Sequence, residues 1–199
     1  MTEPTDSASL PEIAPSHRQT KYQVRFDWGV EGARAVAADA DVVVWVDVLP
    51  PADAHDPDPA AHVPGTGAVL AGGLTTASAV AHWILDEQVR LGRRAMVALV
   101  AAGGRTASGA TRFAVEDLLA AGAIVDALAG LGIDYCSPEA AAASAAFTGL
   151  RGAVAHLLTA SVSGQEQVAA GRAPAEIAPA GRVDSESAVT ILRAVSPTE

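Results

Sequence analysis

The sequence is poor in the residue types on which several large classes of protein depend. It has one cysteine, Cys136, so it can form neither an internal disulfide nor a multi-thiolate metal site. Lys21 is its only lysine, and its arginines are never clustered beyond Arg93–Arg94, which disfavours binding to the phosphates of nucleic acids. No apolar run reaches the ~18 residues that cross a bilayer. We therefore expect neither nucleic acid nor membrane as a partner.

What remains is the composition of a folded domain. Of 199 residues, 50% are hydrophobic and 18% are charged, far from the profile of a disordered chain, and the net charge is −10. Residues 1–20 are polar and aperiodic, which predicts a disordered leader followed by a single domain over 21–199. The leader lacks the basic and apolar regions of a signal peptide, and with the single cysteine this predicts a cytoplasmic protein.

Apolar runs and helical periods alternate along the domain. The run 42–48 predicts a strand buried on both faces, and the spacing of apolar residues over 113–128 predicts a helix. Five prolines in 50–67 predict a linker without regular structure. The alternation predicts an α/β layered fold, with a mixed or mainly parallel sheet flanked by helices. Further strands are predicted at 68–71, 96–102 and 188–193, and further helices at 33–38, 75–90 and between 137 and 158.

One stretch, 112–125, reads RFAVEDLLAAGAIV, so that an arginine and an aromatic residue precede a Glu-Asp pair and an Ala-Gly step. In matching order around it stand the segments 46–49, 73–81, 102–103 and 161–164. Together these motifs resemble the 2-phosphosulfolactate phosphatase family, and the opening at 22–27 is similar to its actinobacterial members. The resemblance covers roughly 22–49 and 68–193. It implies an α/β phosphoric monoester hydrolase that uses Mg²⁺ and takes a small acidic phosphate ester.

Residue by residue, the resemblance implies a candidate site. Hydrolysis of such an ester requires a cation, arginines and helix N-termini to neutralise the transferring group. Asp47 ends a buried strand, where α/β folds usually have their sites. The implied catalytic residues are Asp47, Arg112, Glu116 and Asp117; the implied Mg²⁺ ligands are Asp47, Glu116 and Asp117; and the implied substrate-binding residues are Gly103, Gly104 and Ser161.

Each of these residues also has a structural interpretation. Acidic residues such as Glu116 and Asp117 are common in the first turn of any helix, and Asp47 before prolines is a typical turn former. Arg112 is as well suited to a surface salt bridge with either helix acid as to an anion. Two glycines are a weak motif, and an ordinary turn at Gly103–Gly104 is the better interpretation. Ser161 has no histidine nearby to act as a base.

The sequence departs from the family directly after the first strand. Pro50, Pro51 and Ala52 stand where the family has an arginine and small hydroxyl residues, and the linker replaces a longer segment. A second hypothesis is therefore a catalytically inactive relative that serves as a binding or assembly protein, unless Arg25, Arg34 or Arg105 takes the missing place. A third, weaker hypothesis is an anion-binding module.

Two further features leave questions open. Asp184 lies near a late aspartate of the family, but it also fits a solvated turn. If Trp28 and Trp83 are exposed, they would give this apolar chain a hydrophobic surface of the kind that is buried in a homodimer, so a homodimer is one hypothesis.

Overall fold

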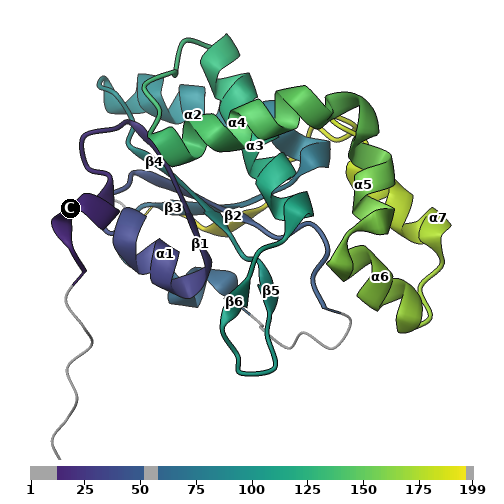
Figure 1. The fold of residues 1–199 in the computed structure, drawn as a ribbon. Coiled ribbons are helices and arrows are strands. Elements are labelled where there is room, and N and C mark those ends of the chain that lie inside the picture. The colour runs from purple at the N-terminus through teal and green to yellow at the C-terminus, as the bar shows by residue number, and fades with distance from the viewer. Residues whose placement is uncertain (1–12, 52–57, 196–199) are drawn as a thin grey trace, which may run out of the picture.

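The computed structural model describes residues 13–51 and 58–195, which form an α/β fold with a five-stranded, mostly parallel sheet between layers of helices (Figure 1). The predicted fold class is therefore confirmed. The order of the strands is β1-β4-β2-β3-β7, and only β7 runs antiparallel to its neighbour. The strands are β1 Val24–Trp28, β2 Val42–Val46, β3 Ala68–Gly72, β4 Val97–Ala101 and β7 Ile191–Arg193.

The central strand β2 explains why the sheet forms here. All five of its residues are buried and apolar, as expected of a parallel strand that is covered on both faces. It pairs with β4 and β3 in matching register, so that Val46 lies opposite Ala101 on one side and Gly72 on the other. The carboxyl ends of β1, β2, β3 and β4 therefore meet at one edge of the sheet. We call this the carboxyl edge, and the opposite one the amino edge.

Helices cover the sheet unequally. On one face, α1 packs its alanines and Val36 against β2 residues such as Val43. On the other face, α2, α3 and α4 enclose a larger core around Leu99, Ile124 and Phe147. The helices are α1 Gly29–Val36, α2 Ala77–Leu91, α3 Val115–Gly130, α4 Pro138–Leu150, α5 Val154–Ala160, α6 Val162–Ala169 and α7 Pro174–Ile177.

The Ala-Gly step of α3 has a packing role. Gly122 lies where the backbone of α4 crosses α3, and a Cβ at this position would overlap the carbonyl oxygen of Ala143. The absence of a side chain therefore lets the two helices approach closely, as small residues at helix crossings do. At the start of α4, Ser137 is the N-cap, because its Oγ accepts a hydrogen bond from the Ala140 amide at 3.2 Å.

The predicted loop after β4 is instead a short hairpin. Gly104–Arg105 (β5) pairs antiparallel with Thr111–Arg112 (β6), and the hairpin projects from the carboxyl edge in Figure 1. The prediction missed it because two-residue strands have no detectable periodicity. Similarly, α6 and α7 were not predicted, and α1 begins at Gly29, earlier than expected.

The proline-rich linker is not free of regular structure, so that prediction is wrong in part. A 3₁₀ helix spans Pro59–His62, and Asp58 caps it by accepting a hydrogen bond from the Ala60 amide at 3.0 Å. Proline is well tolerated at the first position of a helix, which is where Pro59 stands. Residues 52–57 of the linker, including Ala52, lie outside the described residues.

The predicted leader is also ordered in the part that the structure describes. A 3₁₀ helix spans Pro15–Arg18, and the amide group of Gln19 bonds both backbone groups of Phe26 in β1, at 2.9 and 3.1 Å. These bonds give residues 13–20 a defined place beside the sheet, against the prediction of disorder. Residues 1–12 lie outside the described residues.

Candidate functional site

Three acids lie together at the carboxyl edge. Asp47 directly follows β2, and Glu116 and Asp117 stand in the first turn of α3, each only 2% exposed. The negative charges of Asp47 and Glu116 both act on the titration of Asp117, so the three carboxyl groups are electrostatic neighbours. The structure thus brings together the acids that the sequence analysis singled out. Their role as Mg²⁺ ligands stays a prediction.

Asp117 links two loops of the site. Its Oδ1 accepts a hydrogen bond from the Val48 amide and its Oδ2 accepts one from the Gly103 amide, both at 2.9 Å. Val48 follows β2 and Gly103 follows β4, so one buried carboxylate holds the ends of two neighbouring strands to the start of α3. Each oxygen keeps a lone pair free. Positioning is nevertheless the role that these contacts define.

Asp47 and Asp117 have raised pKa values. Burial raises the pKa of Asp117 to about 8, with further contributions from the charges of Asp47 and Glu116, and the amides of Val48 and Gly103 only partly oppose this. Burial and the charge of Glu116 raise the pKa of Asp47 to about 6. Like charges in a poorly solvated site disfavour ionisation, and a cation among them would have the opposite effect.

Glu116 has an oxygen atom without a partner. Its Oε2 is buried and accepts no hydrogen bond from any of the residues that the structure describes, although buried carboxylate oxygens are normally bonded. Within residues 13–51 and 58–195, no group of three or more His, Cys, Asp or Glu side chains has the spacing of a ready metal site. Carboxylate oxygens are nevertheless the donors that Mg²⁺ prefers, so the chemistry of the set fits that ion.

Arg112 points toward α6. Its Nη2 lies 3.4 Å from Ser163 Oγ and 3.7 Å from Glu166 Oε2, and its Nη1 donates to the carbonyl of Phe113 at 3.2 Å. The salt bridge expected as an alternative is thus made with Glu166 of α6 and not with either acid of α3. The two contacts with α6 are long, so the guanidinium is only weakly engaged by that helix.

The two glycines of the predicted substrate loop have different functions in the fold. Gly103 adopts a left-handed φ of +68°, and its amide is the one that Asp117 binds. Gly104 begins β5, where a Cβ would lie only 2.9 Å from Cζ of Arg112. Glycine at 104 therefore lets the guanidinium lie flat against the hairpin backbone. The turn interpretation thus fits Gly103, which lies between β4 and β5, whereas Gly104 is a strand residue.

Ser161 is a helix cap. Its Oγ donates to the Leu158 carbonyl at 2.9 Å and accepts from the Gly164 amide at 3.0 Å, which places it at the N-cap of α6. The hydroxyl hydrogen is thus already used, and the substrate-binding role stays a prediction.

Nearby, Gln167 of α6 donates to the carbonyl of Pro50 at 2.8 Å. Sequence reasoning missed this contact because its partners lie 117 positions apart.

Two of the arginines proposed as replacements are engaged away from the site. Arg25 is 1% exposed; it donates to the carbonyls of Tyr22 and Val36 and pairs with Asp39. Arg34 pairs with Glu31 within α1 at 2.6 Å. Only Arg105, which is exposed on the β5–β6 hairpin, remains near the carboxyl edge.

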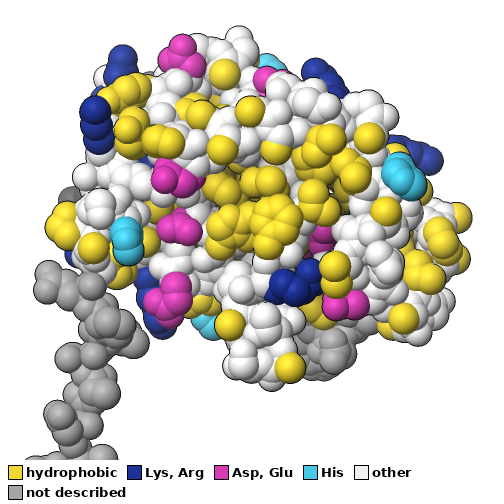
Figure 2. All heavy atoms as spheres, viewed as in Figure 1, with side chains coloured by type: hydrophobic (Ala, Val, Ile, Leu, Met, Phe, Trp, Pro, Cys, Tyr) yellow, Lys and Arg dark blue, Asp and Glu magenta, His cyan; other side chains and the backbone are white. Residues whose placement is uncertain are grey.

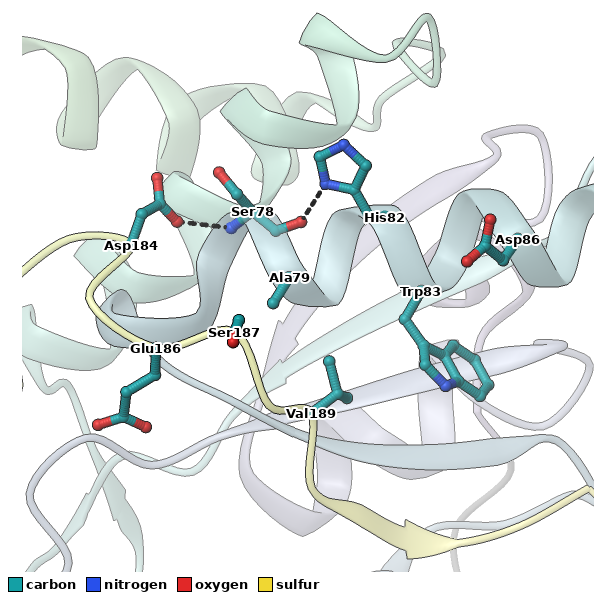
Figure 3. A pocket seen from close by; sticks show the side chains of 9 residues that line it. All are labelled: Ser78, Ala79, His82, Trp83, Asp86, Asp184, Glu186, Ser187 and Val189. Carbon is teal, nitrogen blue, oxygen red and sulfur yellow. Dashed lines mark hydrogen bonds between the residues drawn. The ribbon is translucent and has the colours of Figure 1, made fainter.

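A separate pocket runs along α2, where Asp184 has a structural function (Figure 3). Asp184 Oδ1 accepts a hydrogen bond from the Ser78 amide, in the first turn of α2, at 2.7 Å. His82 contacts the Ser78 carbonyl through Nδ1, and the Trp83 ring lies further along the pocket. Asp184 is therefore a capping residue of α2.

Trp28 and Trp83 are both half-buried and pack against the larger core.

Comparisons with known proteins name no relative. No family model matches the chain, and no curated protein matches it in sequence. The resemblance to the phosphosulfolactate phosphatases therefore stays a prediction. Among the described helices, none is both long enough and apolar enough to span a membrane.

Proposed function

We propose that this chain is a Mg²⁺-dependent phosphatase that hydrolyses a small acidic phosphate ester such as 2-phosphosulfolactate. The observation that supports the proposal is the group of three acids at the carboxyl edge, in which Asp47 and Asp117 have raised pKa values and Glu116 Oε2 has no partner. Burying carboxylates side by side costs stability unless a cation or a proton compensates them. Binding of a hard cation would explain why these three acids stand together despite that cost.

In this proposal the three acids have different roles. Asp47 and Glu116 would hold Mg²⁺ directly, and Asp117 would complete the set while it keeps the loops after β2 and β4 in position. When bound, the ion would neutralise negative charge on the phosphoryl group. Without such neutralisation, three carboxylates would repel a phosphate dianion.

Arg112 is the anion-binding residue of the proposal. Its guanidinium lies against Gly104 and makes only long contacts with α6, so a phosphate or sulfonate group can replace Glu166 as its partner. Ser161 is unsuited as a nucleophile because its hydroxyl already donates to Leu158 and no histidine in the described part of the chain bonds it. Water is therefore the proposed nucleophile.

The direct test is release of inorganic phosphate from 2-phosphosulfolactate and from an aryl phosphate, with Mg²⁺ or with EDTA. We expect release with Mg²⁺ only, and its loss in Asp47→Asn. Asp126→Asn, in the same helix as Glu116 but outside the acid group, is the matched control and should retain activity. Release that is equal with EDTA, or equal in Asp47→Asn, would refute the proposal.

The second candidate is an inactive relative that binds or assembles. The contact that favours it is the bond from Gln167 to the carbonyl of Pro50, because it holds α6 against the segment where the family has an arginine. In that case Mg²⁺ should leave the melting temperature unchanged and no phosphate should be released. Size-exclusion chromatography with light scattering would then be expected to report an oligomer.

A further inference from the structure

An aromatic cluster reaches the surface beside the acid group. The rings of Phe26 and Trp28 have centroids 5.5 Å apart, and those of Trp28 and Phe113 are 5.2 Å apart. Phe26 is buried, Trp28 is half-buried and Phe113 is 58% exposed. The cluster therefore runs from the core to solvent. Leaving most of a phenylalanine ring in water forgoes the stabilisation that its burial would provide.

The cluster lies next to the loop that Asp117 holds. Trp28 is in register with Ala101, and Ala101 is in register with Val46, the residue before Asp47. At a strand spacing of about 4.8 Å, Trp28 is two strands, or roughly 10 Å, from the end of β2. The Gly103 loop lies between them, since a Cβ on Gly103 would lie 3.4 Å from Cε3 of Trp28.

Phe113 is also joined to the anion-binding residue. It follows Arg112 directly, and its carbonyl accepts a hydrogen bond from the Arg112 guanidinium. Figure 2 shows hydrophobic side chains gathered in the middle of this face above the β5–β6 hairpin, with basic and acidic side chains beside them. An apolar planar surface and a weakly engaged cation thus stand side by side.

We propose that Trp28 and Phe113 form the binding surface for a planar aromatic group of the ligand, whose anionic end Arg112 holds. This inference rests on the proposed function for the phosphate part of the ligand; for the organic part it names aryl phosphates as preferred over aliphatic esters such as 2-phosphosulfolactate. An aromatic ring gains from an offset or edge-on contact with Phe113 beyond simple burial. A guanidinium pairs at the same time with the charged oxygens. A small aliphatic ester would leave the Phe113 ring in water.

The test compares two non-hydrolysable anions of equal charge, 1-naphthylmethylphosphonate and methylphosphonate. Their affinities are measured by isothermal titration calorimetry with and without Mg²⁺, so the result does not depend on turnover. We expect the naphthyl compound to bind about tenfold more tightly to the natural protein. Phe113→Ala should reduce this preference to about twofold, and Phe113→Leu should retain part of it.

Tyr135→Ala is the matched control, since Tyr135 is another exposed aromatic residue, 41% exposed, that pairs with Tyr22 away from the site. It should keep the full preference. Because Phe113 is largely exposed, its replacement should leave the melting temperature nearly unchanged, which separates loss of binding from loss of fold. Equal affinities in the natural protein, no binding of either anion, or a preference that persists in Phe113→Ala would overturn the inference.

Failure of the proposed function has a different outcome. If the naphthyl compound binds preferentially but no ester is hydrolysed, the aromatic surface stands and the phosphatase does not. If phosphate is released from small and aryl esters at the same kcat/KM, the phosphatase stands and the aromatic surface does not.

Discussion

Strand β2 has an aspartate at each end, and the two have opposite environments. Asp41, at the amino edge, accepts two hydrogen bonds from Arg93 at 2.7 Å and one from the Met96 amide at 2.8 Å. Although burial acts to raise the pKa of Asp41, these bonds outweigh it, and the pKa lies below its usual value. Asp47, at the carboxyl edge, has the charge of Glu116 as its neighbour, and its pKa is raised.

The contrast separates structure from proposed function. At the amino edge opposite charges are paired, as Arg25 with Asp39 and Arg93 with Asp41, so these pairs stabilise the fold. At the carboxyl edge the acids face one another, and this arrangement costs stability. Groups whose pKa values are shifted by burial and like charge concentrate at functional sites. The unfavourable free energy of these neighbouring acids therefore makes the carboxyl edge the candidate site.

The largest effect is expected from removing the unpartnered oxygen. Glu116→Gln replaces a charged oxygen pair by an amide, and the rate of Mg²⁺-dependent phosphate release should fall about 100-fold, because a weakened cation site loses several kcal/mol of charge stabilisation. Initial rates at saturating Mg²⁺ measure this. Glu87→Gln, in which the replaced acid pairs with Arg90 on α2, is the control. Equal losses in both variants would remove the distinction between the two kinds of acid.

Stability should respond with opposite sign at the two ends of β2. Asp41→Asn weakens the hydrogen bonds from Arg93 and Met96 and should lower the free energy of unfolding by about 2 kcal/mol. Asp47→Asn removes like-charge repulsion and should raise it by about 1 kcal/mol in EDTA near pH 8, after allowance for solvent screening. Urea unfolding measures both. A loss of stability in both variants would break the comparison.

The pH dependence follows from the directions of the pKa shifts. Asp47 and Asp117 have folded-state pKa values of about 6 and about 8, above the ordinary 3.8, so their contribution to stability is present below about pH 4 and is lost as the pH rises through those values. Asp41, with a lowered pKa, contributes above its ordinary value of 3.8 and loses that contribution as the pH falls.

Stability in EDTA should therefore be greatest at about pH 4 and should decline up to about pH 8, most steeply below about pH 6, where both raised acids lose their contribution. Urea midpoints across this range test the profile. Mg²⁺ should restore stability at the alkaline end, since it binds the ionised acids. A profile that is flat from about pH 5 to about pH 8 in EDTA would contradict the raised values.

The smallest effect distinguishes a cap from a ligand-binding residue. Ser161→Ala should lower the free energy of unfolding by about 1 kcal/mol, because the N-cap of α6 is lost. Phosphate release under conditions where the variant is folded should change by less than about twofold, within the range of an indirect effect. A large rise in KM without a change in stability would instead restore Ser161 to the substrate site.

Local patterns were enough to predict the central elements. The strand around Val42–Val46 and the helix Val115–Gly130 are long and strongly apolar, so period and length identify them. The convergence of Asp47 with the acids of α3 was implied by the family resemblance, and it agrees with the geometry of parallel strands, whose carboxyl ends lie at one edge of the sheet. The structure agrees with that arrangement, and the chemistry stays to be measured.

Contacts between distant residues could not be predicted in this way. Asp117 and Val48 are 69 positions apart, and Asp184 and Ser78 are 106 apart, so no local pattern connects them. The cap of α6 was missed because Ser161 is followed at the third helical position by Gly164, where a capping box would have Glu or Gln. Tertiary packing, not propensity, decides such positions.

The bonds of Asp117 have an evolutionary consequence. Because this carboxylate fastens the chain at Val48, and Leu49 is buried directly after it, the backbone that presents Asp47 is secured before the prolines begin. Insertions, deletions and changes of composition from Pro50 onward can then accumulate without displacing that aspartate. The segment that begins at Pro50 is thus the part of this scaffold that can change most freely.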